Sequence, residues 1–336
     1  MYTLLFGYLL FVLALSTVVG TLWSLAYFRF QTPKYHTPSN WPTLTVFVPI
    51  YNEASIIVQF LQNLLNTLNG YKGQIQLILI DDGSTDGTVS LIRSNFLKLT
   101  LLVDGLNKGK LERIIQASKM ATGEYFLVID ADVVLTAESL EILVATLFSN
   151  PKAATVQPYM IPITPSKIAL FLGRVFTTGW EMWIRKAQGG MGTLSLWGCQ
   201  CSLARTKVLK VAIKNATGKP MFKAGRDDSS LGAEGFATTN WLMVFQPLAT
   251  ATAQQAGSTK AFVQQTKRHR SGRIAKLQSL FALLFVKPYF AISMIALEIL
   301  YLVTFRPIIE VLAFALRCKN EWRPVGSRWS SAQNQQ

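Results

Sequence analysis

The sequence predicts an α/β protein with a doubly wound, mostly parallel sheet, joined to an N-terminal transmembrane helix. Three observations lead to this class. Strand-like and helix-like segments alternate from residue 44 to about residue 140, polar side chains follow the strand-like segments, and the first 28 residues carry no charge. In doubly wound sheets, ligands bind beyond the carboxyl ends of the strands. The polar clusters therefore mark the edge where a ligand site is expected.

The alternating segments have the lengths and patterns of strands and helices. The predicted strands are 44–50, 75–80, 99–103 and 125–129, and the predicted helices are 56–68, 89–96, 111–120 and one capped by Thr136. The run from Ile75 to Ile80 is apolar except at Gln76, which is typical of a strand buried on both faces of a parallel sheet. A β-α-β-α order requires such a sheet, because parallel strands need crossover helices.

Composition excludes several classes of protein. Half of the 336 residues are hydrophobic and 15% are charged, against roughly 25% charged in an average soluble domain. An apolar chain of this kind is not disordered, the 22 glycines and 13 prolines exclude a collagen-like fibre, and three cysteines do not make a disulfide scaffold. The net charge of +15 leaves a globular protein with membrane contact, a polyanion binder, or both.

The N-terminal segment predicts a membrane anchor. Residues 1–28 are long enough to cross the hydrocarbon core, which takes about 20 apolar residues in a helix. No basic residue precedes the segment, as one would in a cleaved signal peptide. Arg29 and Lys34 follow it directly, so the positive-inside rule places the rest of the chain in the cytoplasm. A buried N-terminal helix is the alternative.

The remaining chain divides by composition into three further parts. Residues 40–275 form a cytoplasmic body of ordinary single-domain size, residues 277–316 form a membrane hairpin or interfacial helices, and residues 317–336 form a basic cytoplasmic tail. Within the body, aromatic residues recur at helical spacing over about 167–187. This segment is predicted to be an amphipathic helix at the membrane surface or a core helix of the domain.

Carboxylates and a lysine after the predicted strands could serve phosphate chemistry. Asp130 and Asp132 directly follow a buried strand, where they could bind one divalent cation, although aspartate is also common in ordinary turns. The acidic stretch from Asp82 resembles a calcium loop, but Arg93 stands where that loop needs glutamate. Lys110 begins a helix one residue short of P-loop spacing, so only a lysine near phosphates is expected there.

Two later motifs allow more than one interpretation. Asp227 and Asp228 are either acidic residues at a helix N-terminus or hold a general base that takes a proton from an attacking hydroxyl. A basic cluster over 267–276 suits membrane headgroups. The planar guanidinium of Arg268, within that cluster, could also bind a diphosphate.

Taken together and in order, these motifs resemble the membrane-bound family 2 glycosyltransferases. That group includes cellulose, hyaluronan and chitin synthases and ceramide glucosyltransferase. The resemblance covers about residues 43–272 and rests on six stretches: 48–53, 81–88, 107–110, 130–132, 227–232 and 265–268. It implies a GT-A fold and an inverting sugar transfer from a nucleotide-diphosphate donor, with a UDP-sugar favoured.

The resemblance also implies roles for individual residues. The nucleoside and phosphates would be held by Pro49, Tyr51, Glu53, Asp81, Asp82 and Lys110. Asp130 and Asp132 would hold the donor and a divalent cation, Mg²⁺ or Mn²⁺. Asp228, with Asp227 beside it, aligns with the catalytic base, while Gln265 and Arg268 align with the diphosphate-facing motif. Gly198 and Cys199 begin a stretch that resembles the acceptor entrance.

Three departures from the family pattern bear on the acceptor. Asp227 replaces the usual glutamate, His269 replaces the tryptophan that borders the acceptor sugar in polymerising members, and few transmembrane segments are present to form a channel. The last two favour a single addition to a membrane lipid or lipid-linked glycan over processive polysaccharide synthesis. A processive enzyme completed by partner subunits or by homo-oligomerisation is the alternative. Nucleic-acid binding is not expected, because the positive charge lacks the motifs that accompany it.

Overall fold

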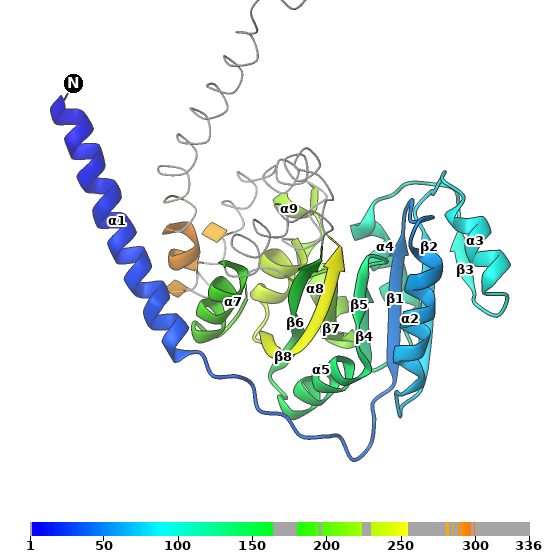
Figure 1. Cartoon of the computed structure of the whole chain (residues 1–336). Helices are drawn as coiled ribbons and strands as arrows, with labels where there is room; N and C mark the ends of the chain where they lie inside the picture. The colour runs from blue at the N-terminus through cyan, green and yellow to red at the C-terminus, as the bar shows by residue number, and fades with distance from the viewer. Residues whose placement is uncertain are drawn as a thin grey trace, which may run out of the picture. The chain divides into compact units, whose positions relative to one another are not determined.

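The computed structural model describes residues 2–163, 180–194, 197–223 and 230–254, with some further positions between 280 and 299. The chain divides into two compact units. One consists of residues 1–22 and 292–336, and the other of residues 23–291. The second unit contains the whole sheet and every site residue described below (Figure 1).

The N-terminal segment forms one helix, α1 (Tyr2–Arg29), over the range expected from the sequence. Within the described residues, Phe6–Arg29 is the one helix long and apolar enough to cross a membrane. Core helices of soluble proteins and signal sequences share this length and composition. Many of its large apolar side chains are exposed, Phe11 and Phe28 among them.

The end of α1 that belongs to the second unit packs against α7 (Trp180–Gly190). Trp23 stacks on Trp183 with ring centroids 5.5 Å apart. A Cβ atom on Gly190 would lie 1.8 Å from the carbonyl oxygen of Ala26, so only glycine allows the two helices to approach this closely. The described side chains of α7, residues 182–190, are all buried or half-buried.

The first half of the body forms the predicted alternation, with one short additional strand, β5, that the sequence did not predict. Its elements are β1 (Leu44–Ile50), α2 (Ile57–Asn69), β2 (Ile75–Asp81), α3 (Thr88–Asn95), β3 (Leu101–Val103), α4 (Lys110–Met120), β4 (Tyr125–Ile129), β5 (Val133–Leu135) and α5 (Ala137–Ser149). Strands β3, β2, β1 and β4 lie side by side and are parallel. As predicted, Thr136 caps α5, because its side-chain oxygen accepts the N–H of Ser139 at 3.1 Å.

The second half of the body completes an eight-stranded sheet. Its elements are β6 (Ala153–Ile163), α7, β7 (Cys201–Arg205), α8 (Thr206–Ala216), α9 (Pro220–Lys223), the π-helical turn η2 (Ser230–Gly235), the 3-10 turn η3 (Phe236–Thr238) and β8 (Leu242–Gln254). The strand order is β3-β2-β1-β4-β7-β6-β8-β5.

The sheet is mixed and mostly parallel, as expected, with antiparallel pairs confined to β7 and β5. β7 is antiparallel to both β4 and β6, and β5 is antiparallel to β8, whereas β6 and β8 are parallel to each other. The β6–β8 register shifts between Pro158 and Tyr159, opposite the stretch of β8 that holds Pro247. Prolines inside strands lack the N–H that pairing needs, and a bulge accommodates them.

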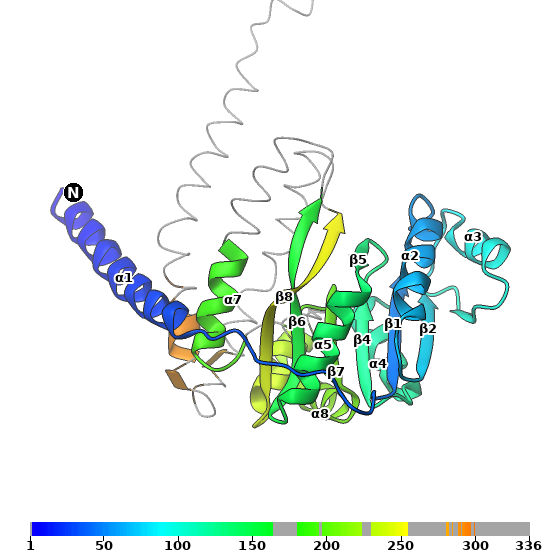
Figure 2. The same cartoon turned by 60° about the horizontal axis from the view of Figure 1, so that its bottom comes forward.

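Helices cover both faces of the sheet, as the doubly wound pattern requires (Figure 2). On one face, α2 and α5 bury leucines such as Leu61 and Leu143 against Val46 and Val48 of β1. The other face is covered by α4 and α8, with Ile114 and Leu209 fully buried. Burial on both faces explains why the central strands β1 and β4 consist mostly of apolar residues.

Candidate functional site

The loops that follow β1, β2, β3 and β4 meet at the carboxyl edge of the sheet. The N–H of Asp82 donates to the carbonyl of Ile50 at 2.7 Å, which joins the ends of β1 and β2. Antiparallel β7 brings its first residue to the same edge, where Cys201 pairs with Ile129. The end of β8 also reaches this edge, because the N–H of Gln254 donates to the carbonyl of Asp132 at 3.1 Å.

Side chains of the β1 and β2 loops bind each other's backbone. The N–H of Asn52 donates to Ser84 Oγ at 2.9 Å, and the N–H of Thr85 donates to Asn52 Oδ1 at 2.8 Å. Asn52 takes a left-handed φ of 55°, a conformation that asparagine tolerates better than most residues. Of the predicted donor-side residues, Pro49 lies within β1, Tyr51 is half-exposed at its end, and Glu53 follows with its N–H bonded to Thr88 Oγ1.

Asp81 ends β2 with a buried carboxylate that is only partly satisfied. Its Oδ2 accepts the N–H groups of Gly83 and Ser84, both at 3.0 Å. Its Oδ1 is buried and has no hydrogen-bond partner among the described residues. An unsatisfied buried carboxylate oxygen is costly, so this atom is available to a donor group from a ligand.

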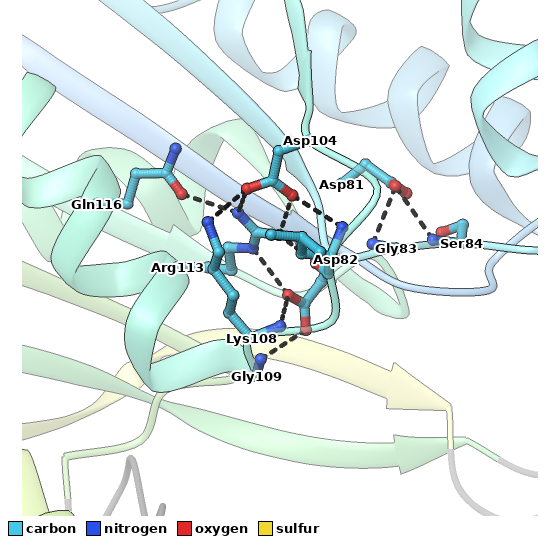
Figure 3. A network of polar contacts seen from close by, with 10 residues as sticks. Asp81, Asp82, Gly83, Ser84, Asp104, Lys108, Gly109, Arg113 and Gln116 are labelled. Carbon is cyan, nitrogen blue, oxygen red and sulfur yellow. Dashed lines mark hydrogen bonds and ion pairs between the residues drawn. The ribbon is translucent and has the colours of Figure 1, made fainter.

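Asp82 lies in a different environment, because its carboxylate is occupied by the protein (Figure 3). Oδ1 accepts the N–H of Lys108 at 2.8 Å and Nε of Arg113 at 2.7 Å, and Oδ2 accepts the N–H of Gly109 at 3.0 Å. Arg113 also binds Asp104 through two nitrogens, at 2.7 and 2.9 Å. Sequence reasoning missed Arg113 and Asp104. The sequence feature that could have indicated a buried Arg113 is its position in the first turns of a predicted helix, close to the apolar residues Leu111 and Ile114.

Lys110, the first residue of α4, reaches across the edge to the carboxylate that follows β4. Its Nζ lies 2.6 Å from Oδ1 and 2.7 Å from Oδ2 of Asp130. Both side chains remain about a quarter exposed, at 26% and 22%. The lysine and the first aspartate of the predicted metal motif therefore form an ion pair that a ligand can still reach.

Asp132 fits the binding of a divalent cation. Burial raises the pKa of its carboxyl, Lys110 partly offsets this, and Asp132 Oδ1 is buried without a hydrogen-bond partner among the described residues. Glu53 lies close enough for its pKa to be raised to about 7, first by burial and then by the negative charges of Asp132 and Asp86. A cation between these carboxylates would relieve both effects.

The described residues contain no cluster of three or more His, Cys, Asp or Glu side chains in metal-binding arrangement. A cation bound by Asp130 and Asp132 would thus have few ligands from the protein. Mg²⁺ is often held in this way, by one or two carboxylates with substrate phosphates and water completing the shell. The donor set accordingly suits a cation that binds together with a phosphorylated substrate.

The predicted acceptor-side stretch lies directly beside the metal motif. The N–H of Asp130 donates to the carbonyl of Gln200 at 2.8 Å. Cys199 is fully buried, and a Cβ atom on Gly198 would lie 3.1 Å from Oε1 of Gln157. Burial, and then the charge of Asp130, raise the pKa of the Cys201 thiol. The structure therefore brings the acceptor-side and metal-side predictions together at one edge.

Five predicted site residues lie outside the described part of the chain. These are Asp227, Asp228, Gln265, Arg268 and His269. The described chain on either side of the acidic pair ends at Lys223 and resumes at Ser230. Gln254, which precedes the other three, ends β8 at the carboxyl edge. The roles of all five remain predictions.

The fold is shared with a solved enzyme of nucleotide-sugar chemistry. A mannosyltransferase from Pyrobaculum calidifontis, solved in complex with GDP-Man and Mn²⁺, superimposes with a TM-score of 0.60 at 18% identity, covering 91% of this chain and 90% of that one. At this identity the likeness concerns the fold alone. It supports the GT-A class that the sequence predicted.

Sequence comparison then supports the family that the motifs resemble. Residues 45–202 match the model of Glycosyl transferase family 2. Related curated proteins include the UDP-forming cellulose synthase catalytic subunit of Pseudomonas fluorescens, 30% identical over 144 residues. The undecaprenyl-phosphate 4-deoxy-4-formamido-L-arabinose transferase of Proteus mirabilis is 28% identical over 109 residues. The poly-β-1,6-N-acetyl-D-glucosamine synthase of Staphylococcus aureus is 28% identical over 118 residues.

These three alignments are partial on both sides. They cover 41%, 31% and 34% of this chain and 18%, 33% and 27% of the respective relatives. The chain thus spans about a third or less of the length of these relatives.

Proposed function

We propose that the protein is a membrane-anchored, inverting glycosyltransferase that transfers one sugar from a nucleotide-diphosphate donor to a lipid-linked or membrane-associated acceptor. One observation carries the proposal: Lys110, Asp130 and the partly unsatisfied Asp132 lie together at the carboxyl edge of a family 2 sheet. This group offers positive charge and hard oxygen ligands at the place where α/β sheets bind nucleotides.

The donor would lie across the ends of β1, β2 and β4. Asp81 Oδ1, buried and lacking a partner in the described chain, would accept a donor N–H from the nucleobase or a ribose hydroxyl. Tyr51 and Glu53 lie at the same edge of the sheet, directly after β1. Lys110 would move between Asp130 and the diphosphate oxygens, both of which are anionic partners within its reach. A divalent cation bound by Asp130 and Asp132 would supply charge neutralisation of the departing diphosphate.

The transfer itself would be a single displacement at the anomeric carbon. Asp228 would accept the proton of the acceptor hydroxyl while the acceptor oxygen bonds to that carbon and the bond to the diphosphate oxygen breaks. One displacement on the opposite face inverts the anomeric configuration. Gln265 and Arg268 would stabilise the diphosphate leaving group, since a planar guanidinium binds phosphate oxygens through two donors.

The acceptor would be a membrane lipid or a lipid-linked glycan. The apolar helix Phe6–Arg29 supports membrane anchoring, because its exposed side chains are those that a bilayer accepts. The arginine and lysine residues that follow it favour a cytoplasmic catalytic unit. The Proteus relative, whose name specifies undecaprenyl phosphate, supports a polyprenyl-phosphate acceptor.

The test is a donor screen on the purified, detergent-solubilised protein. UDP- and GDP-sugars are supplied with Mn²⁺ and membrane lipid extract, and release of nucleotide diphosphate is measured together with transfer of labelled sugar to lipid. We expect transfer from one donor, dependent on the cation and on the lipid. A variant with Asp130 and Asp132 both changed to asparagine is the matched inactive control. Failure of every donor to transfer would contradict the proposal.

A processive polysaccharide synthase is the second candidate. The cellulose and poly-N-acetylglucosamine synthases among the relatives favour it, while His269, at the position of the family's tryptophan, opposes it. It would require partner subunits or a homo-oligomer to form a channel. Product length with labelled donor separates the two: a single-sugar lipid product supports our proposal, and a polymer ladder supports the synthase.

A further inference from the structure

Arg113 is an almost fully buried charged side chain near the carboxyl edge. It lies in the first turns of α4, its side chain is 1% exposed, and its guanidinium binds four partners: Asp82, Asp104, Gln116 Oε1 and the carbonyl of Leu106. A guanidinium has five N–H donors in a fixed plane. In this cluster (Figure 3) those donors are directed at the protein itself, so Arg113 does not act by touching a ligand.

The cluster joins three loops that come from different strands. Asp82 follows β2, Asp104 follows β3, and Arg113 belongs to the helix that begins after Gly109. Hydrogen bonds from Arg113 and Lys108 keep the pKa of Asp104 below its ordinary value, and the same carboxylates raise the pKa of Arg113. Both groups are therefore ionised, and the interactions are charge-assisted bonds, which are stronger than neutral ones.

The segment fixed by this cluster is the one that delivers Lys110. The N–H groups of Lys108 and Gly109 point at Asp82, and the Leu106 carbonyl points at Arg113. The loop also passes close to the β2 loop, because a Cβ atom on Gly83 would lie 3.0 Å from the Asn107 nitrogen. Lys110 comes directly after Gly109, so its starting point is set by these contacts before its Nζ reaches Asp130.

We propose that Arg113 is a positioning residue for the donor nucleotide: it ties Asp82 to Asp104 and thereby fixes the 106–109 loop from which Lys110 reaches the diphosphate. This inference rests on the proposed function, since it assigns Arg113 to the donor half of the same site. Removing the guanidinium leaves two carboxylates in partly buried positions without their shared counter-charge, and such a loss drives local rearrangement. The rearrangement would displace Lys110 rather than the acceptor side.

The experiment compares Arg113→Met, Arg113→Lys and Asp104→Asn with the wild-type protein in the same detergent. Calorimetric titration measures Kd for UDP and GDP in the presence of Mn²⁺, and steady-state kinetics give donor KM and kcat. Hydrogen exchange of the peptide covering 104–110 reports the loop directly. Arg93→Met is the charge-matched control, because Arg93 is exposed on the neighbouring helix α3. Thermal unfolding verifies that each variant is folded at the assay temperature.

We expect Arg113→Met to weaken nucleotide binding and raise donor KM about tenfold, with kcat changed less than about threefold, as for loss of a charge-assisted bond that holds ground-state geometry. Arg113→Lys should recover part of the affinity, because it restores the charge without the planar fork. The 104–110 peptide should exchange faster in Arg113→Met, and Arg93→Met should leave all three measurements unchanged. If Arg113→Met does not fold, Arg113→Lys and Asp104→Asn provide the same test, with smaller expected changes in Kd and donor KM.

Two outcomes overturn the inference in distinguishable ways. If the wild-type protein binds a nucleotide and the three variants bind it equally well, Arg113 has only a stabilising role and the positioning claim is wrong. If kcat falls while KM and Kd stay constant, the cluster acts on the chemical step and the claim is wrong as stated. If the wild-type protein binds neither nucleotide and transfers no sugar, the proposed function fails and this inference falls with it.

Discussion

Lys110 Nζ lies 2.6 Å from Asp130 Oδ1, so the first residue of α4 is paired with the first residue after β4. The two come from loops that neighbour each other at one edge of the sheet, 20 residues apart in sequence. The ion pair holds the lysine side chain beside the N-terminus of α4. Backbone N–H groups at a helix N-terminus also favour anions. It is the contact that a diphosphate would have to replace.

Changing Lys110 to methionine should lower kcat/KM for the donor about a hundredfold, as for removal of one donor that stabilises a developing charge. The side chain keeps its length, and the charge that faces the diphosphate is lost. Lys119→Met is the matched control, because Lys119 is exposed in the last turn of the same helix. Equal effects of the two substitutions on donor kinetics would contradict a specific role for Lys110.

Changing Asp132 to asparagine should shift the Mn²⁺ concentration for half-maximal activity upward by about tenfold or more, since a neutral amide is a weaker ligand for a hard cation than a carboxylate. The measurement is a Mn²⁺ titration of nucleotide diphosphate release, with EDTA as the metal-free limit. Wild-type activity that persists in EDTA would rule out the cation role given to Asp130 and Asp132.

Changing Glu53 to glutamine should stabilise the ligand-free protein at high pH. The folded-state pKa of Glu53 is raised from 4.5 to about 7, so the folded state is relatively favoured while the group is protonated and loses that advantage as pH rises through 7. The half-buried position reduces the effect to about 1 kcal/mol after allowance for solvent screening. Thermal unfolding should show the variant above wild type at pH 8 and equal to it near pH 4.5.

A cation bound with a nucleotide diphosphate should remove that difference, because positive charge beside Glu53 lowers its pKa again. The same unfolding scans with Mn²⁺ and the donor's nucleotide provide the check. A variant that stays more stable than wild type at pH 8 under both conditions would indicate a cause other than the charge on Glu53.

Changing Asp228 to asparagine should abolish sugar transfer and leave nucleotide affinity close to that of wild type, because the proposed base acts only on the acceptor hydroxyl. The parallel variant Asp227→Asn should retain measurable turnover. Calorimetry with the donor's nucleotide and a transfer assay measure the two quantities separately. Turnover retained in Asp228→Asn would show that another group takes the proton.

Sequence patterns predicted the first half of the sheet because its central strands, β1 and β4, are buried on both faces. Val46, Phe47 and Val48 leave no polar interruption to obscure a strand, and Thr136 is a strong helix cap. The second half carries prolines inside its strands, at Pro158 and Pro162 in β6 and Pro247 in β8. Such strands do not follow the usual strand pattern, and the register shift between β6 and β8 next to Pro158 accommodates Pro158 and Pro247.

The site residues that sequence patterns could predict were those next to strand ends and helix starts. Asp81, Lys110, Asp130 and Asp132 were found because each follows a strand or begins a helix, and parallel topology then brings them together. Asp82 was predicted beside Asp81, yet its carboxylate is bonded to Lys108, Gly109 and Arg113. A buried arginine makes no periodic pattern, since its position depends on carboxylates that only the folded chain brings near.

The packing of Trp23 and Ala26 against α7 determines where a soluble version of this enzyme can begin. A shortened chain that starts at residue 30 or 40, as the hydropathy profile alone suggests, would lack the indole that stacks on Trp183 and would uncover the glycine face at Gly190. The last turns of the apolar helix therefore belong to the catalytic unit in folding terms. A truncation designed for crystallisation or assay in water should retain the chain from Trp23 onward.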